Sequence, residues 1–533
     1  MEVCTFDDFP SLMNAIKCAS SVSQAVVGGI ASILVATHLG PLIVPSLLLM
    51  TTFKLWSVYT NVKDPGNRLP LPPGTMGFPL VGETLEFLRK GSEFFRERTK
   101  SYGCIYKTHI LGQRTIRVSG AANVAKILKG EGELVASQWP PSAKFILGSG
   151  ALAHSKGEKH AWRRMMIAKA FTPDAVATYI PAIQETIRDY IGQWCRSGHI
   201  HGYPEARSLT FTVAARMLLG FNVHDKQKHQ MLILFEDMLA TLFSMPVPIP
   251  GIGLYKGLKA RRRIMQEIGQ CIQKRQKPSE APGDDALSKI LHAIAEDGHD
   301  ALSTVEMQDS ALEMLFAGHL PTSSAACSVL GLIASNPTVY DKASMELFRQ
   351  GLLDPNLNEE LTPSDIKNLP YIDAIIKEVL RVAPPVGAGY RKALKTFDLD
   401  GHQVPKGWTI IYSIRETQHT SSSYSEAEKF NPDRWIEDTQ LAHKSAASKV
   451  DDSEYDFVPF GSGQRSCVAH RYVETFLKIF IIELVRNSNW KLENGLPQVA
   501  YMPVPHPVDN LPLSFRKVEM EQRRRAFTLP AKP

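Results

Sequence analysis

The chain has 533 residues, of which 44% are hydrophobic and 21% charged, and its formal net charge is +6. Such a chain can bury a large core, and its charged fraction is ordinary for a globular protein. No basic stripe with interleaved aromatic residues is present, which argues against nucleic-acid binding. The positive surplus fits either a solvated surface or attraction to an anionic membrane or an acidic partner.

The first predicted element is an apolar N-terminal run. Residues 22–53 carry no charged side chain except His38 when protonated, and Lys17 and Lys54 flank them. The run is long enough to span a bilayer, although two prolines interrupt it. It is too long for a signal-peptide core and shows no clear small-residue cleavage site. We therefore predict an uncleaved membrane anchor over residues 1–55.

A proline-rich stretch follows this anchor. Residues 64–74 read DPGNRLPLPPG, and clustered prolines form a stiff, extended connector rather than a helix. We predict a hinge over residues 56–75 and a single catalytic body over residues 76–533. An anchor followed by a stiff hinge places that body against the membrane.

Two hairpin patterns predict a small β-sheet region in the body. Residues 104–110 alternate, turn at Gly112 and continue into residues 115–118. Residues 397–399 turn at Asp400-Gly401, resume near Val404 and lead to residues 409–412. Short alternating runs separated by glycine turns are typical of antiparallel strands.

Helices are predicted for most of the rest. Ser303 and Glu306 form a capping box that opens a long helix running toward Leu332. It is apolar on several sides, so we expect it to cross the core. Apolar spacing over residues 372–380 predicts an amphipathic helix that ends before Pro384-Pro385.

Cys467 lies in the most informative motif. The seven cysteines are scattered and none forms a C-x-x-C pair, which argues against a disulfide framework or a structural zinc site. Residues 457–470 read FVPFGSGQRSCVAH, so a glycine-rich turn precedes Cys467 and a helical pattern follows it. A metal-bound thiolate needs a fixed position, shielding from solvent, and nearby N–H groups to stabilise its charge.

This run resembles the cysteine loop of the cytochrome P450 superfamily, Phe-Gly-x-Gly-x-Arg-x-Cys. The resemblance implies the cytochrome P450 fold, mainly α with a small β-sheet region, and haem b bound through the Cys467 thiolate. A buried structural thiol is the ordinary alternative for a single cysteine, but the surrounding pattern outweighs it. The loop residues implied to contact the haem are Phe460, Gly461, Gly463 and Arg465, the arginine through a propionate.

Further haem contacts are implied by the same resemblance. His160 and Arg164 match positions where the family places a Trp or His and a basic residue against the propionates. Arg391 matches another propionate partner.

A buried ion-pair cluster is also implied. Glu378 and Arg381 stand three apart on one predicted helix face, where they can pair. The stretch 430–435, FNPDRW, resembles the motif whose arginine, here Arg434, completes the cluster. In the family this cluster is structural. A solvated surface pair is the alternative for the first two residues taken alone.

Over nearly the whole chain after the anchor, the resemblance is closest to the animal retinoic-acid hydroxylases. It rests on stretches such as residues 72–79 (PPGTMGFP), 139–142 (WPPS) and 146–150 (ILGSG). It implies a monooxygenase that hydroxylates retinoic acid or a related apolar isoprenoid acid, with electrons from NADPH through a reductase. Trp139, Phe316 and Ala317 are the expected substrate contacts. The expected location is the endoplasmic reticulum membrane, with the catalytic body in the cytosol.

The central helix departs from the family pattern. Members usually carry an acid followed by a threonine there, which organise water for proton delivery. Here Leu320 and Pro321 occupy those two positions. Leucine cannot relay a proton, and proline removes a helix N–H and kinks the helix. His319 and Thr322 are the candidate catalytic substitutes, if the kink turns one of them toward the iron.

Two other functions stay open because of this departure. One is a haem-thiolate isomerase or dehydratase that acts on a lipid hydroperoxide without oxygen activation. The other is a degenerate relative that only binds a ligand. A requirement for reduced nicotinamide and a reductase distinguishes the monooxygenase from both.

Overall fold

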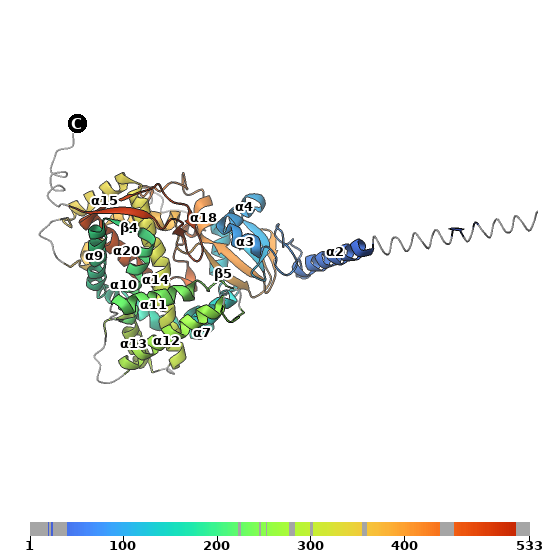
Figure 1. Cartoon of the computed structure of the whole chain (residues 1–533), viewed down its shortest axis with the longest axis horizontal. Helices are drawn as coiled ribbons and strands as arrows, with labels where there is room; N and C mark the ends of the chain where they lie inside the picture. The colour runs from blue at the N-terminus through green and yellow to red at the C-terminus, as the bar shows by residue number, and fades with distance from the viewer. Residues whose placement is uncertain are drawn as a thin grey trace, which may run out of the picture.

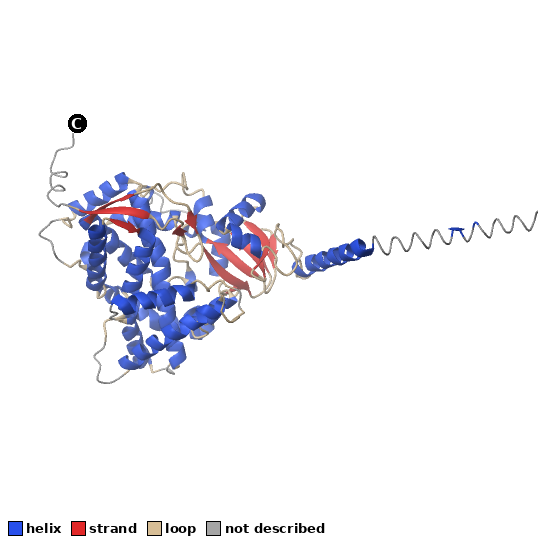
Figure 2. Cartoon of the chain, viewed as in Figure 1, coloured by secondary structure: helices blue, strands red, loops and turns tan. Residues whose placement is uncertain are grey.

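The structure is a computed structural model that describes residues 20, 23–24, 40–221, 225–244, 247–251, 253–276, 283–298, 302–353, 360–436 and 452–518. Helices make up most of the body, and the largest sheet lies at the end from which the N-terminal helix α2 projects (Figures 1 and 2). A mainly helical body with a small β-sheet region confirms the predicted fold class.

The α-helices share the body with short strands. The helices are α2 Gly40–Thr60, α3 Thr84–Lys90, α4 Ser92–Tyr102, α5 Ala121–Lys129, α6 Pro141–Leu147, α7 Gly157–Ala168, α8 Pro173–Ala177, α9 Ile180–Ser197, α10 Gly202–Leu219, α11 Asp225–Leu239, α12 Leu254–Arg275, α13 Ala286–Asp297, α14 Thr304–Ala334, α15 Pro337–Arg349, α16 Pro363–Lys367, α17 Pro370–Val382, α18 Ile414–Thr420 and α20 His470–Asn487. The strands are β1 Ile105–Ile110, β2 Gln113–Val118, β3 Val135–Ser137, β4 His199–His201, β5 Ala388–Ala393, β6 Phe397–Leu399, β7 His402–Val404, β8 Thr409–Ser413, β9 Ser488–Leu492, β10 Val499–Ala500, β11 His506–Pro507 and β12 Pro512–Lys517.

Helix α14 crosses the centre of the body, as predicted. The Ser303 hydroxyl accepts a hydrogen bond from the Glu306 N–H, and the Glu306 side chain caps the Ser303 N–H in return. Among the described residues α14 is the one helix long and apolar enough to cross a membrane, and 67% of its most apolar window is buried inside the body. It is therefore a core helix. It continues as an α-helix through Pro321.

The main sheet has five strands in the order β1-β2-β8-β5-β3. The predicted hairpin of residues 104–118 is confirmed as the antiparallel pair β1 and β2, with Ile105 opposite Val118. The second predicted hairpin is confirmed in part. β6 and β7 pair as predicted but form their own two-stranded sheet, whereas β8 joins the main sheet parallel to β2.

Helix α2 extends beyond the predicted anchor boundary. It ends at Thr60, so residues 56–60 of the predicted hinge are helical. These five residues contain no proline or glycine, and nothing in them stops a helix. The indole N–H of Trp56 donates to the Gly77 carbonyl over 3.1 Å, which ties the end of α2 to the body. Residues 1–19, 21–22 and 25–39 of the predicted anchor lie outside the described residues.

Candidate cofactor and substrate site

The cysteine loop is a tight turn closed on itself. Gly461 and Gly463 have φ angles of +68° and +67°, a region that side-chain-bearing residues rarely adopt. The Cys467 N–H donates to the Phe460 carbonyl over 2.8 Å, which closes the turn. Helix α20 begins three residues later, at His470. The predicted turn followed by a helix is therefore present, and both glycines are explained by backbone conformation.

The Cys467 thiol is half-buried, three residues before this helix. Burial raises the pKa of the thiol, while the Ala469 N–H and the Arg164 guanidinium oppose that rise. A thiol of this kind is most readily ionised by binding a metal cation. The loop therefore holds a sulfur ligand in a fixed, half-buried position.

Two side chains of α7, Arg164 and His160, lie near the loop. Arg164 donates to the Ser466 carbonyl over 2.7 Å and to its hydroxyl over 3.0 Å. His160, on the same helix, is 5% exposed. Burial, followed by the charges of Arg465 and Arg164, lowers the pKa of His160 to about 4. The imidazole is therefore neutral at physiological pH and faces a cationic neighbourhood.

Arg391 and Arg465 meet at a carboxylate that the sequence motifs did not indicate. Glu131, between α5 and β3, lies 2.8 Å from Arg391 Nε and 3.1 Å from Arg465 Nε. Arg465 also donates to the Ser155 carbonyl, just before α7, over 2.8 Å. The structure thus brings all four predicted propionate partners around one loop. Residues 129–133, KGEGE, read as a surface turn, so no sequence signal identified Glu131.

Helix α14 is open on one face in the middle of the core. Ala317 is exposed and Pro321, one turn further on, is partly exposed, whereas most neighbouring positions on the helix are buried. Phe316 packs edge-on against Trp139, with the ring centroids 6.3 Å apart. Of the three predicted substrate contacts, Phe316 and Ala317 therefore belong to this face and Trp139 packs against it. We call Phe316, Ala317 and Pro321 the open face of α14.

His319 points away from the open face. Its ring lies between Phe211 and Phe235, with centroids 5.5 and 5.7 Å away. Its Nδ1 is 3.0 Å from the hydroxyl of Thr210 in α10. That hydroxyl already donates to the Ala206 carbonyl, so Nδ1 is assigned as the donor. Burial lowers the pKa of His319 to about 3, which keeps the ring neutral.

Thr322 shares that orientation. It stands one helical turn after Gly318, and a Cβ at Gly318 would lie 2.4 Å from Leu218 of α10. Residues four apart lie on one face of a helix. Thr322 is 3% exposed, and its hydroxyl has no hydrogen-bond partner among the described residues. The contacts of His319 and the helical phase of Thr322 place both on the α10 side, so the geometry does not support the prediction that either turns toward the iron.

The segment before α7 packs closely on α14. Gly148 has φ +93°, and a Cβ there would lie 2.2 Å from the Asp309 carboxylate. The Gly150 N–H donates to Asp309 over 2.9 Å, and the Ala153 N–H donates to Glu313 over 2.8 Å. Glu313 precedes Ala317 by one turn. Two acids of α14 therefore hold this segment beside the open face by its backbone.

The predicted ion-pair cluster is present and buried. Glu378 accepts two hydrogen bonds from Arg381, both 2.8 Å, and one from Arg434, 3.0 Å. The Glu378 and Arg381 side chains are 0% exposed. The Asn431 N–H and the Trp435 indole N–H also donate to Glu378. This saturation excludes the solvated-pair alternative and gives the cluster a structural role.

Replacing Glu378 by alanine is expected to lower the free energy of unfolding by about 3–5 kcal/mol, because Arg381 is left buried without its anion. Burial raises the pKa of Glu378, but hydrogen bonds, led by that of Arg381, bring it below its usual 4.5. The contribution is therefore present above pH 4.5 and is lost as pH falls through the lowered value. Urea denaturation near neutral pH measures the change. The exposed Glu426–Lys429 pair supplies the control, since Glu426→Ala should change stability little. Equal losses in the two variants would contradict the structural role.

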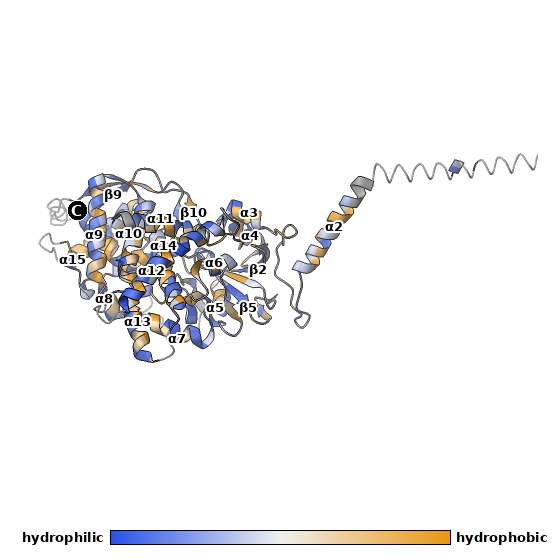
Figure 3. Cartoon of the chain, turned by 60° about the horizontal axis from the view of Figure 1, so that its bottom comes forward, coloured by the Kyte–Doolittle hydropathy of each residue, from blue (hydrophilic) through white to orange (hydrophobic). Residues whose placement is uncertain are grey.

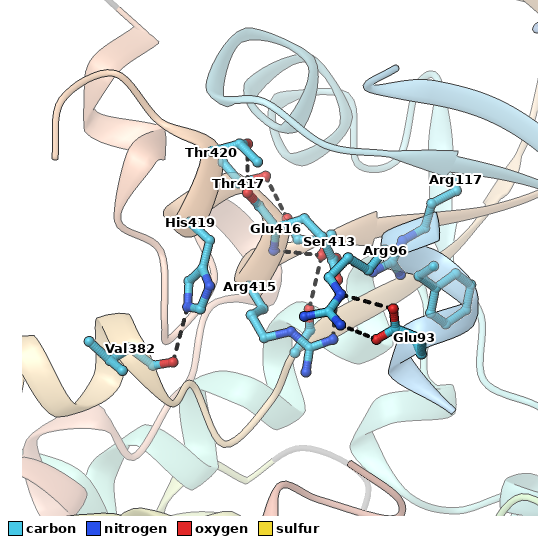
Figure 4. Close-up of polar contacts among 12 residues, drawn as sticks. Glu93, Arg96, Arg117, Val382, Ser413, Arg415, Glu416, Thr417, His419 and Thr420 are labelled. Atoms are coloured by element: carbon cyan, nitrogen blue, oxygen red, sulfur yellow. Dashed lines mark hydrogen bonds and ion pairs between the residues drawn. The ribbon is translucent and has the colours of Figure 1, made fainter. Parts of the chain in front are cut away.

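Helix α18 connects this cluster to the main sheet. Glu416 of α18 forms a buried ion pair with Arg117 of β2 (Figure 4). Its Oε1 also lies 3.1 Å from the guanidinium Nη2 of Arg415. The His419 Nε2–H donates to the Val382 carbonyl, at the end of α17, over 3.0 Å. The helix that carries Glu378 is thus fixed to the sheet that carries Arg391.

These residues fit a haem. This group requires a sulfur ligand, a flat apolar contact and partners for its propionates. The half-buried thiol, the open face of α14 and the buried or half-buried guanidiniums of Arg164, Arg391 and Arg465 match these needs. The protein is therefore of the class whose helical body encloses a thiolate-bound prosthetic group.

Comparisons with known proteins agree with this class. The family model described as Cytochrome P450 matches residues 72–503. "Cytochrome P450 26A1" of Gallus gallus is 40% identical over 91% of this chain and 98% of its own length. "Cytochrome P450 26C1" of Homo sapiens is 38% identical over 89% of this chain and 94% of its own. A solved structure, "Retinoic acid bound cyanobacterial CYP120A1", is 33% identical with a TM-score of 0.77, covering 85% of this chain and all of its own. The chain belongs to the cytochrome P450 family, whose members bind haem through a cysteine thiolate.

Proposed function

We propose that this cytochrome P450 is a monooxygenase that hydroxylates retinoic acid or a closely related isoprenoid acid. The observation that carries the proposal is the similarity to a P450 structure with retinoic acid bound, which this chain covers in full at a TM-score of 0.77. The open face of α14, with Trp139 against Phe316, offers apolar contacts of the kind a polyene chain needs.

In this proposal Cys467 is the iron ligand. Haem b, held there, supplies the iron at which dioxygen is reduced. Arg465, Arg391, Arg164 and His160 bind or border the propionates and fix the ring relative to α14. Trp139, Phe316 and Ala317 orient the substrate and exclude water from it, which favours a defined position of attack.

Electrons are proposed to come from NADPH through a reductase. Hydroxylation by dioxygen needs two electrons, which the reductase would deliver. The net charge of +6 is compatible with an acidic redox partner.

Incubating the full chain with all-trans retinoic acid tests the function. We expect a substrate-induced shift of the Soret band and a hydroxylated product that forms only with NADPH and reductase. Binding without product under these conditions would favour the ligand-binding alternative. The isomerase alternative draws support from Leu320 and Pro321, and conversion of a lipid hydroperoxide without reductase would establish it instead.

We also propose that the protein is anchored in the endoplasmic reticulum membrane with its body in the cytosol. Hydrophobic residues recur along α2 where it projects from the body (Figure 3). Leu48 and Met50 are 63% and 68% exposed. The segment that contacts α2 through Gly77 and Phe78 continues to Leu80 and Leu85, which are 84% and 70% exposed. An apolar surface continuous with an apolar helix supports contact with lipid.

A chain that begins at Asp64 is expected to become largely extractable without detergent, because it lacks the anchor run and α2. The measurement is the fraction of protein released from membranes by carbonate, with the full chain as the reference. Residual attachment of the short chain should fall further on Leu80→Ser, since that side chain projects from the body surface. Release of the full chain by carbonate alone would contradict an integral anchor.

A further inference from the structure

Two arginines from distant parts of the chain share one buried carboxylate. Arg391 Nε lies 2.8 Å from one oxygen of Glu131 and Arg465 Nε 3.1 Å from the other. The three side chains are 7%, 12% and 6% exposed for Arg391, Arg465 and Glu131. The Ser137 N–H of β3 also donates to Glu131, over 3.0 Å. The carboxylate is therefore fixed to the sheet and in turn fixes both guanidiniums.

The charges of this trio do not cancel. Two guanidiniums and one carboxylate leave a net positive charge in a nearly buried place, and burial penalises an unmatched charge. Arg391 uses another N–H on the Tyr390 carbonyl, and Arg465 uses one on Ser155. Each guanidinium has five N–H groups in a fixed fork. The two arginines therefore still have N–H donors and positive charge to bind a second anion. A carboxylate, such as a haem propionate, is an anion of the right geometry.

We propose that Glu131 is a positioning residue for the haem: it holds Arg391 and Arg465 ready for the propionates and lowers the reduction potential of the iron. The proposal rests on the haem site of the proposed function. Without Glu131 the two guanidiniums repel one another and are free to turn toward other acceptors. With it, Arg465 Nε–H is hydrogen-bonded to the carboxylate. Arg391 is held beside the carboxylate by the ion pair alone, so N–H groups of both guanidiniums are left for a further anion.

The sign of the effect on the potential follows from charge. Reduction of the iron adds one electron to the ring and its surroundings. A fixed negative charge next to the propionates makes that addition less favourable, and the effect is strong where little water screens it. Neutralising Glu131 therefore raises the reduction potential.

The test compares Glu131→Gln, Glu131→Asp and Glu133→Gln in the haem-loaded full chain. Glu133 lies two residues away and pairs with Lys395, but its side chain is 76% exposed. We measure the midpoint reduction potential and the rate of haem transfer to an acceptor globin. Glu131→Gln should raise the potential and speed haem loss roughly tenfold, as loss of an outer-layer partner does at other metal sites. Glu133→Gln should match the wild type in both.

Glu131→Asp separates charge from placement. It keeps the negative charge but is one methylene shorter, so the potential should stay near the wild-type value while haem loss is faster. If Glu131→Gln accumulates without haem, the rate of haem loss is measured on Glu131→Asp instead. A Glu131→Gln potential equal to that of Glu133→Gln, or wild-type haem retention by Glu131→Asp, would overturn the proposal. The red-shifted Soret band of each reduced carbonyl complex reports separately whether the haem assignment itself holds.

Discussion

Cys467→Ala is expected to abolish the red-shifted Soret band of the reduced carbonyl complex, together with all hydroxylation. The band requires a thiolate on the iron, and alanine offers no ligand. Arg164 and the propionate partners stay in place in this variant, so some haem should still bind, with an ordinary carbonyl spectrum. The loss is therefore expected to be one of ligation and not of folding.

The matched control is Cys195→Ala. Cys195 is half-buried like Cys467 but lies in α9, and burial likewise raises the pKa of its thiol. This variant should keep the red-shifted band and the activity. Retention of that band by Cys467→Ala would show that another residue ligates the iron.

The start of α14 and the cysteine turn were predictable because their signals are local. Ser303 and Glu306 are three residues apart and cap each other, so the sequence alone identifies the helix start. Gly461 and Gly463 indicate a turn for the same reason, because their positive φ angles are a property of the few residues around them. The conformation of such local motifs does not depend on which distant residues pack against them.

The orientation of His319 could not be predicted in the same way. The sequence places it near the middle of a core helix, but which side it faces depends on the packing of α10 and α11 against α14. Glu131 was missed for a related reason. Its partner Arg465 is 334 positions away, and no periodicity links them. Pairings of this kind come from the assembled fold.

The second large expected effect concerns Leu320 and Pro321, which stand in α14 where the family usually carries an acid and a threonine. Leu320 is 3% exposed and offers no proton donor, and Pro321 has no N–H, so the Ala317 carbonyl lacks its usual helical donor. Since neither His319 nor Thr322 faces the open side, the wild type should couple electron use to product poorly. The double variant Leu320→Glu/Pro321→Thr restores an acid and an alcohol at the usual positions. A positioned acid or base contributes about 10²–10⁴-fold to a proton transfer.

We expect the double variant to form more product per NADPH consumed and to release less hydrogen peroxide. Both are measured in one reaction with reductase and retinoic acid. Pro321→Thr also returns a donor to the Ala317 carbonyl, so geometry changes along with chemistry. The single variant Leu320→Glu isolates the acid. The control Leu320→Gln/Pro321→Thr has the same shape and backbone as the double variant but no ionisable group.

A gain in the glutamate variants and none in the glutamine control would assign the effect to proton delivery. Equal gains in both would assign it to the helix donor restored at residue 321. Tight coupling in the wild type would instead mean that protons arrive through a group outside the 319–322 turn. Glu313 would then be the first residue to replace, because it lies one turn before Ala317 and its pKa is raised by burial, which keeps a proton available at higher pH. Glu313→Gln retains an acceptor for one of its two backbone partners, so a loss of coupling at unchanged substrate binding would identify it as the proton source.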